Sequence, residues 1–158
     1  MIVMKRFIPY FAVLAIPVLF SCNQESNKGA ANDKADSVLN TTCYQAIDGP
    51  DTAKMNVDET AAGKIKGKLY IKFEEKGPND GTFEGEFRGD TLFVDYSFTI
   101  NTTNKTIYKN PLAFLKKDGK LLMGVGQIQT TLGRSFFVKG KPIDFEKGRF
   151  QFAPVDCK

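Results

Sequence analysis

The chain has 158 residues, of which 42% are hydrophobic and 25% are charged, and its formal net charge is +4. That balance includes two cations of a predicted leader, so the remainder lacks the strongly basic face typical of nucleic-acid-binding proteins. The chain contains no histidine, and this disfavours both a metal centre and histidine-based acid-base catalysis.

The first segment of the chain is typical of a bacterial lipoprotein signal. Two basic residues precede an apolar stretch over residues 7–20, and Cys22 follows the small residue Ser21 directly. The stretch is shorter than the ~20 apolar residues of a membrane-spanning helix. We therefore predict that residues 1–21 are removed and that Cys22 carries acyl chains, such as palmitate, which anchor the protein in a bilayer. The alternative is an ordinary secreted protein cut near Ser21.

Residues 22–41 are expected to form the lipidated cysteine and a flexible tether, because they contain almost no large apolar side chains. The triplet 36–38 resembles an O-glycan acceptor of Bacteroidota-type bacteria, which makes Ser37 a candidate glycosylation site. Some Gram-negative lipoproteins that are displayed on the surface carry an acidic cluster after the anchor, whereas here Glu25 stands alone. We expect a periplasm-facing outer-membrane protein, with surface display as the alternative.

The chain has three cysteines, an odd number for an exported protein. Lipidation of Cys22 would leave Cys43 and Cys157 as a pair, at the two ends of the predicted folded region, residues 42–158. Because disulfides persist outside the cytoplasm, we predict that these two residues form one. The competing interpretation is two buried free thiols. No metal ligand set is expected from two thiols alone.

Apolar and polar residues alternate with period two from Gly63 onward, which is typical of β-strands with one buried face. In the stretch 64–73 the apolar positions Ile65, Leu69 and Ile71 alternate with lysines. No segment shows a helical period that would predict a helix. The chain is therefore predicted to be all-β.

The Gly89-Asp90 pair predicts a two-residue hairpin turn of type II′. This turn determines a register in which an apolar residue or glycine meets an apolar residue on one face. The predicted pairs are Phe87 with Leu92, Gly85 with Val94, and Phe83 with Tyr96.

A second hairpin is predicted at Asp118-Gly119, a favoured type I′ pair. Its expected pairs are Leu115 with Leu122, Phe114 with Met123, and Leu112 with Val125. This ribbon is apolar on both faces. Leu115 and Leu122 are either covered by the Cys43 segment or another loop, or they form an exposed patch for a partner.

Together the patterns predict about eight to ten short antiparallel strands. The remaining candidates are residues 42–47, 54–58, 106–112, 135–139 and 149–152. We expect a small antiparallel β-barrel, lipocalin-like in architecture, because a disulfide between the first and last strands would join the edges that closure brings together. A β-sandwich is the alternative. About eight strands leave an interior that is filled or just holds one small ligand.

Acidic side chains on one strand face are the candidates for a hydrolase site. Glu84 is predicted opposite Asp95, and a simple connecting loop over residues 76–80 would place Lys72 beside Glu84. Charge pairing on a solvated face accounts for this row without catalysis. No catalytic residue and no cofactor are therefore predicted.

Three stretches carry a resemblance to a known group: Gly81–Tyr96, Ala113–Leu121 and Val155–Cys157. They resemble small uncharacterised lipoproteins of Bacteroidota-type bacteria. The resemblance implies a lipobox, a tether and a compact β domain, and it implies no activity. The likeness to lipocalins is one of architecture only.

The function expected from these features is non-catalytic binding by a membrane-anchored envelope lipoprotein. The ligand would be a small apolar molecule, a lipid or a glycan fragment, held in or at the mouth of the barrel. The alternative is a structural or protein-interaction module with a filled barrel and no ligand. The predicted partners are the lipid bilayer and this ligand, with no nucleic acid.

Overall fold

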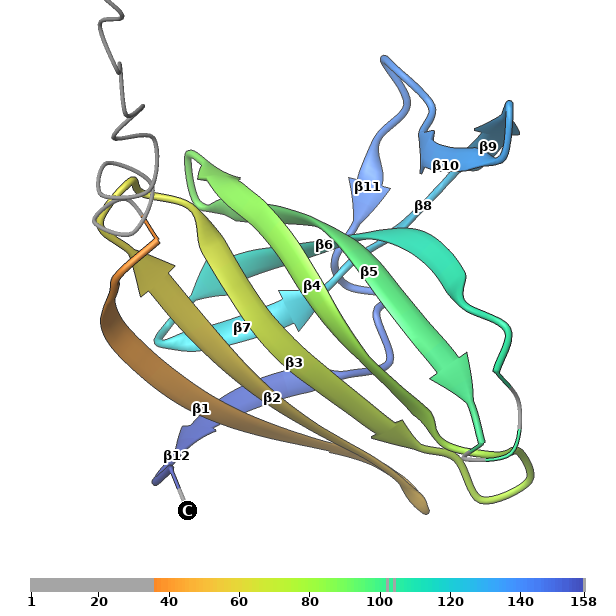
Figure 1. Ribbon diagram of the computed structural model, residues 1–158, viewed down its shortest axis with the longest axis horizontal. Helices are drawn as coiled ribbons and strands as arrows, with labels where there is room; N and C mark the ends of the chain where they lie inside the picture. Colours follow the sequence, from red (N-terminus) through yellow and green to blue (C-terminus); the bar gives the residue numbers. More distant parts are fainter. Residues whose placement is uncertain (1–35, 102, 104, 158) are drawn as a thin grey trace, which may run out of the picture.

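The computed structural model describes residues 36–101, 103 and 105–157. Eight antiparallel strands form a closed barrel in the order β1-β12-β7-β6-β5-β4-β3-β2, and the described residues contain no helix (Figure 1). The predicted all-β barrel is confirmed, and the sandwich alternative is excluded. The barrel strands are β1 (Val38–Asp48), β2 (Asp51–Thr60), β3 (Ile65–Lys72), β4 (Asn79–Arg88), β5 (Thr91–Ile100), β6 (Tyr108–Lys117), β7 (Lys120–Met123) and β12 (Gln151–Val155).

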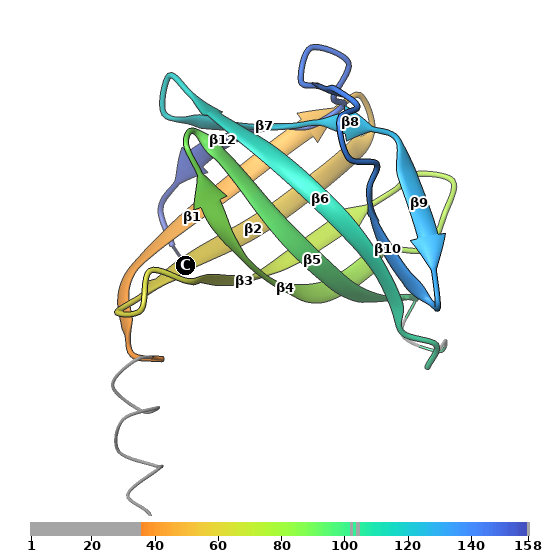
Figure 2. The ribbon, with the colours of Figure 1, turned by 90° about the horizontal axis from the view of Figure 1, so that it is seen from above.

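Between β7 and β12 the chain leaves the barrel. This excursion contains the paired strands β9 (Ile128–Thr131) and β10 (Arg134–Phe137), and the shorter pair β8 (Val125–Gly126) and β11 (Ile143–Asp144). The β9–β10 hairpin lies outside the barrel wall, alongside β6 (Figures 1 and 2).

Both predicted hairpin turns are present, because the residues at each turn suit its backbone. Gly89 has a φ of 61° at the first turn, and Asp118 and Gly119 have φ values of 51° and 76° at the second. The predicted pairs of the first hairpin are all observed.

In the second hairpin, Leu115 faces Leu122 and Phe114 faces Met123 as predicted, but Leu112 does not pair with Val125. Val125 instead pairs with Asp144. The prediction was wrong because β7 ends at Met123. A Cβ on Gly124 would lie 2.5 Å from the side chain of Ile143, so the close approach of this loop requires glycine where the chain turns away.

The first strand begins at Val38, earlier than the predicted boundary at residue 42. Residues 38–41 pair with β2 from Thr60 to Asp58, although their own side chains are exposed. The predominantly polar composition of residues 22–41 as a whole predicted a tether, whereas pairing with β2 makes residues 38–41 part of a strand.

Phenylalanine fills one part of the barrel interior. The largest fully buried side chains include Phe83, Phe114 and Phe152, and the rings of the last two meet edge to face with centroids 5.7 Å apart. Gly67 makes room for Phe83, because a Cβ at this position would lie 2.8 Å from an atom of the ring. Close packing of this kind leaves no space for a ligand in that part of the barrel.

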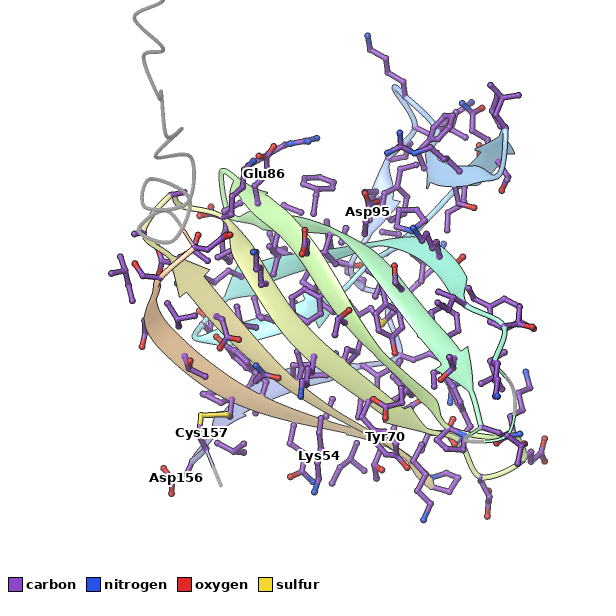
Figure 3. All side chains as sticks on the ribbon, viewed as in Figure 1. Lys54, Tyr70, Glu86, Asp95, Asp156 and Cys157 are labelled. Atoms are coloured by element: carbon purple, nitrogen blue, oxygen red, sulfur yellow. A yellow bond between two sulfur atoms is a disulfide. The ribbon has the colours of Figure 1, made fainter. Side chains whose placement is uncertain are left out.

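The barrel closes where β12 inserts between β7 and β1. Cys43 in β1 faces Val155 in β12, and Cys43 forms a disulfide with Cys157 across 114 residues of sequence. The predicted disulfide is confirmed, and it lies at the seam between the first and last strands (Figure 3). The free-thiol alternative is excluded.

We predict that a Cys43→Ser/Cys157→Ser double variant loses about 2–5 kcal/mol of unfolding free energy, because its unfolded chain is no longer constrained by a long loop. Urea denaturation followed by circular dichroism measures the change. A Thr42→Ser variant at the neighbouring position serves as the control. Equal denaturation midpoints for the double variant and the wild type would contradict the prediction.

Candidate functional site

A cavity of about 260 Å³ lies at one end of the barrel. Most of its wall is apolar, with Ile71, Phe73, Phe98, Leu112, Met123 and Phe150 among the lining side chains. Asn79, Asn110 and Arg149 are the polar side chains at its edge, apart from the Tyr96 hydroxyl. An apolar pocket with a few convergent polar groups is the usual form of a small-molecule site.

Short strands open this end of the barrel. β7 has 4 residues and β12 has 5, whereas β6 has 10. The part of β6 before Ala113 therefore has no β7 partner on that side, and Gly124, Val125 and Gly148 of the excursion line the opening instead. The mouth is a consequence of where the chain leaves and re-enters the wall.

Tyr96 forms a rigid part of the cavity wall. Its ring stacks on Phe98 with centroids 4.7 Å apart, and its hydroxyl donates a hydrogen bond of 2.8 Å to the carbonyl oxygen of Leu69. Burial raises the pKa of this phenol, with a smaller contribution from the charge of Asp80. Because the hydroxyl proton is already used in this bond, Tyr96 acts as a shape-determining residue.

Arg149 at the mouth joins the start of the last strand to the turn between β1 and β2. Its Nε donates to Asp48 at 2.6 Å, and its Nη2 donates to Asp51 at 2.7 Å. Asp51 is 7% exposed and also accepts the N–H of Glu74 at 2.9 Å. That N–H, followed by the arginine, lowers the pKa of the Asp51 carboxyl. We refer to Asp48, Asp51 and Arg149 as the mouth clasp.

The mouth clasp was not predicted from the sequence. Arg149 and Asp48 are separated by 101 positions in the chain, and only barrel closure brings them together. Asp51 follows Gly49-Pro50, a turn sequence, so local pattern indicated a turn residue and nothing more. The one signal in the sequence that could have indicated the clasp was Arg149, a cation just before the last apolar strand.

The proposed partner patch, Leu115 and Leu122, is half-buried on the outer side of the β6–β7 ribbon. Neither alternative drawn from the sequence therefore applies in full, because the two side chains are only partly covered and do not form a strongly exposed patch. The β9–β10 hairpin carries three exposed apolar side chains, and one of them is the most exposed large apolar side chain among the described residues: Leu132 is 98% exposed, Ile128 47% and Phe136 40%. Sequence reasoning missed this hairpin, because Leu132-Gly133 is not a common turn pair, although both residues have positive φ.

Glu84 lies opposite Asp95 as predicted, but Lys66 and not Lys72 stands beside Glu84. The register prediction was wrong because β4 begins at Asn79, so the preceding loop is displaced from its predicted place at 76–80. Lys66 also contacts Asp36 at 2.7 Å. Asp95 and Glu86 lie on the outer surface, away from the cavity (Figure 3).

Two predicted modification sites remain predictions. Cys22, with the signal and most of the tether, lies outside the described residues. Ser37 is exposed just before β1, and its carbonyl oxygen accepts the N–H of Ala61. Within the described ranges there is no cluster of His, Cys, Asp or Glu side chains suited to a metal ion, and no helix long and apolar enough to span a membrane.

Comparison with known proteins gives no family for this chain. No family model, no curated protein and no solved structure matches it. The features that bear on function are therefore the geometry of the cavity and of its mouth.

We predict that stability depends on pH through the mouth clasp. The pKa of Asp51 is lower in the folded protein than the value of about 3.9 expected for an unfolded chain. Its contribution is therefore present above that value and is lost as the pH falls through the folded-state pKa. Asp51→Asn should lower stability at neutral pH and reduce the decline in unfolding free energy between about pH 5 and about pH 2.

Urea denaturation at a series of pH values measures this effect. Asp90→Asn, at the exposed tip of the β4–β5 hairpin, is the matched control and should keep the wild-type decline. A decline in Asp51→Asn as steep as in the wild type would refute the role assigned to the clasp.

Proposed function

We propose that this protein is a lipid-anchored envelope protein that binds a small apolar ligand at the mouth of its barrel, without catalysing a reaction. The observation that carries the proposal is the apolar cavity of about 260 Å³ at the open end. Ligand pockets usually measure about 300–1,000 Å³, and a cavity of about 150 Å³ can hold benzene. The size therefore suits a short alkyl chain or a small ring system.

The packed part of the interior limits how much of a ligand can enter. Phe83, Phe114 and Phe152 leave room for the end of an acyl chain and none for a whole lipid. The apolar wall also disfavours a glycan fragment, because buried sugar hydroxyls would find few hydrogen-bonding partners there. Among the ligands considered from the sequence, an acyl chain or a similar apolar group fits best.

Membrane anchoring belongs to the same proposal and is supported by the sequence around Cys22. Outer-membrane attachment facing the periplasm would expose the barrel to apolar molecules that pass between the membranes. The absence of histidine from the whole chain supports a binding role over hydrolysis.

We predict that Cys22→Ser prevents anchoring, because the thiol is the atom that accepts the lipid. Metabolic labelling with a clickable palmitate analogue should label the wild type and not the variant. After cell fractionation, the wild type should follow the outer membrane and Cys22→Ser should not. Labelling of the Cys22→Ser protein would show that the anchor assignment is wrong.

We also predict that Val125→Trp blocks the cavity. Val125 lines the mouth and is 52% exposed, so an indole can be accommodated there without disturbing the packed interior. Binding of N-phenyl-1-naphthylamine, measured by fluorescence, should weaken at least roughly tenfold in this variant, because the apolar contact area is taken by the indole.

Ile47→Trp is the matched control, since Ile47 is 65% exposed and does not line the cavity. It should bind the dye like the wild type. A wild-type protein that binds no dye, and that retains no ligand in native mass spectrometry, would contradict the binding function.

One observation favours a second candidate, an interaction module. Leu132 is 98% exposed at the tip of the β9–β10 hairpin, in a left-handed conformation with φ of 51°. An exposed leucine in this strained backbone region is uncommon and is a feature of functional loops. The same native mass spectra distinguish the two candidates, since an interaction module would be found in an assembly and without ligand.

A further inference from the structure

The polar side chains of the cavity are arranged around β5. Asn79 in β4 pairs with Ile100, and Asn110 in β6 pairs with Tyr96, so both asparagines lie on strands that flank β5. Both side chains line the cavity. Neither amide makes a hydrogen bond to another group in the part of the chain that the structure describes.

An amide side chain both donates and accepts hydrogen bonds, and it carries no charge. Either of these groups, at the edge of an apolar cavity, can hold the polar end of a ligand while its apolar body occupies the space below. They complement an amide, hydroxyl or ester equally well. They offer no counter-charge to an ionised group.

Charge at the mouth also acts against an anionic ligand. Arg149 is the one charged side chain among the described residues that line the cavity, and its guanidinium already binds Asp48 and Asp51. The adjoining depression, of about 290 Å³, adds Glu74, Glu75 and Lys76. Carboxylates therefore outnumber cations around the opening, and a ligand carboxylate or phosphate would be repelled.

A cationic end is disfavoured for a different reason. An ammonium group in the cavity would lose its hydration against an apolar wall, with the Arg149 guanidinium as its nearest charged neighbour. The carboxylates of Asp48 and Asp51 are already hydrogen-bonded to that arginine. Neither a positive nor a negative group on the ligand would therefore meet an unpaired counter-charge among the described residues that line the cavity.

We propose that the ligand of this cavity is an uncharged amphiphile, with a short apolar body inside the barrel and an amide, hydroxyl or ester end bound by Asn79 or Asn110, which lie opposite positions four residues apart on β5. This inference depends on the proposed binding function and deepens it. Free fatty acids and long-chain amines are excluded as preferred ligands. Neutral acyl derivatives are the class that the mouth selects.

Three probes of equal chain length test the inference: octanamide, octanoate and octylamine. Each is titrated against N-phenyl-1-naphthylamine bound to the full mature chain carrying Cys22→Ser, at neutral pH. Octanamide should displace the dye at least roughly tenfold more effectively than either charged probe, because a charged end must be desolvated without a partner. Octanoate or octylamine displacing the dye as well as octanamide does would overturn the inference and leave the binding function intact.

Variants of the two asparagines show whether the mouth makes the selection. At least one of Asn110→Leu and Asn79→Leu should weaken octanamide binding roughly three- to tenfold, the loss expected for one hydrogen bond. Asn40→Leu, at an exposed position outside the cavity, is the matched control. Unchanged octanamide affinity in both cavity variants would refute the assigned role. A protein that binds neither the dye nor any probe would refute the binding function itself.

Discussion

Closure between β1 and β12 is the constraint on which the rest of the structure depends. The barrel sheet runs without interruption from β1 to β7, but its two edges meet only through β12, a strand of 5 residues. Two covalent or charged links reinforce this short strand. The Cys43–Cys157 disulfide lies after it, and the mouth clasp of Arg149 with Asp48 and Asp51 lies before it. The strand that forms the seam is thus fixed at both ends.

The same short strands create the candidate site. Because β7 stops at Met123 and β12 starts only at Gln151, the wall is incomplete beside β6, and the cavity opens there. The clasp residue Arg149 lies at this opening, so the seam and the cavity share a side chain. The bonds that close the barrel therefore also pair Arg149, the one charged side chain among the described residues that line the cavity.

Prediction from the sequence succeeded where the determining interactions are local. The Gly89-Asp90 turn and the apolar alternation around it specify the β4–β5 register, and Phe83 does face Tyr96. It failed where a loop conformation decides the outcome. The position of Lys66 beside Glu84 depends on the loop before Asn79, whose length could not be read from its residues.

The sequence by itself determined the all-β class, the turns at Gly89-Asp90 and Asp118-Gly119, and the pairing of Cys43 with Cys157, because each follows from periodicity, turn chemistry or cysteine number. Only the tertiary structure decided that β7 ends early, that Asn79 and Asn110 share a cavity, and that Arg149 meets Asp48 and Asp51. These arrangements join segments far apart in the chain. Their geometry depends on how the whole sheet curves and closes, and no local sequence pattern encodes the distance between such segments.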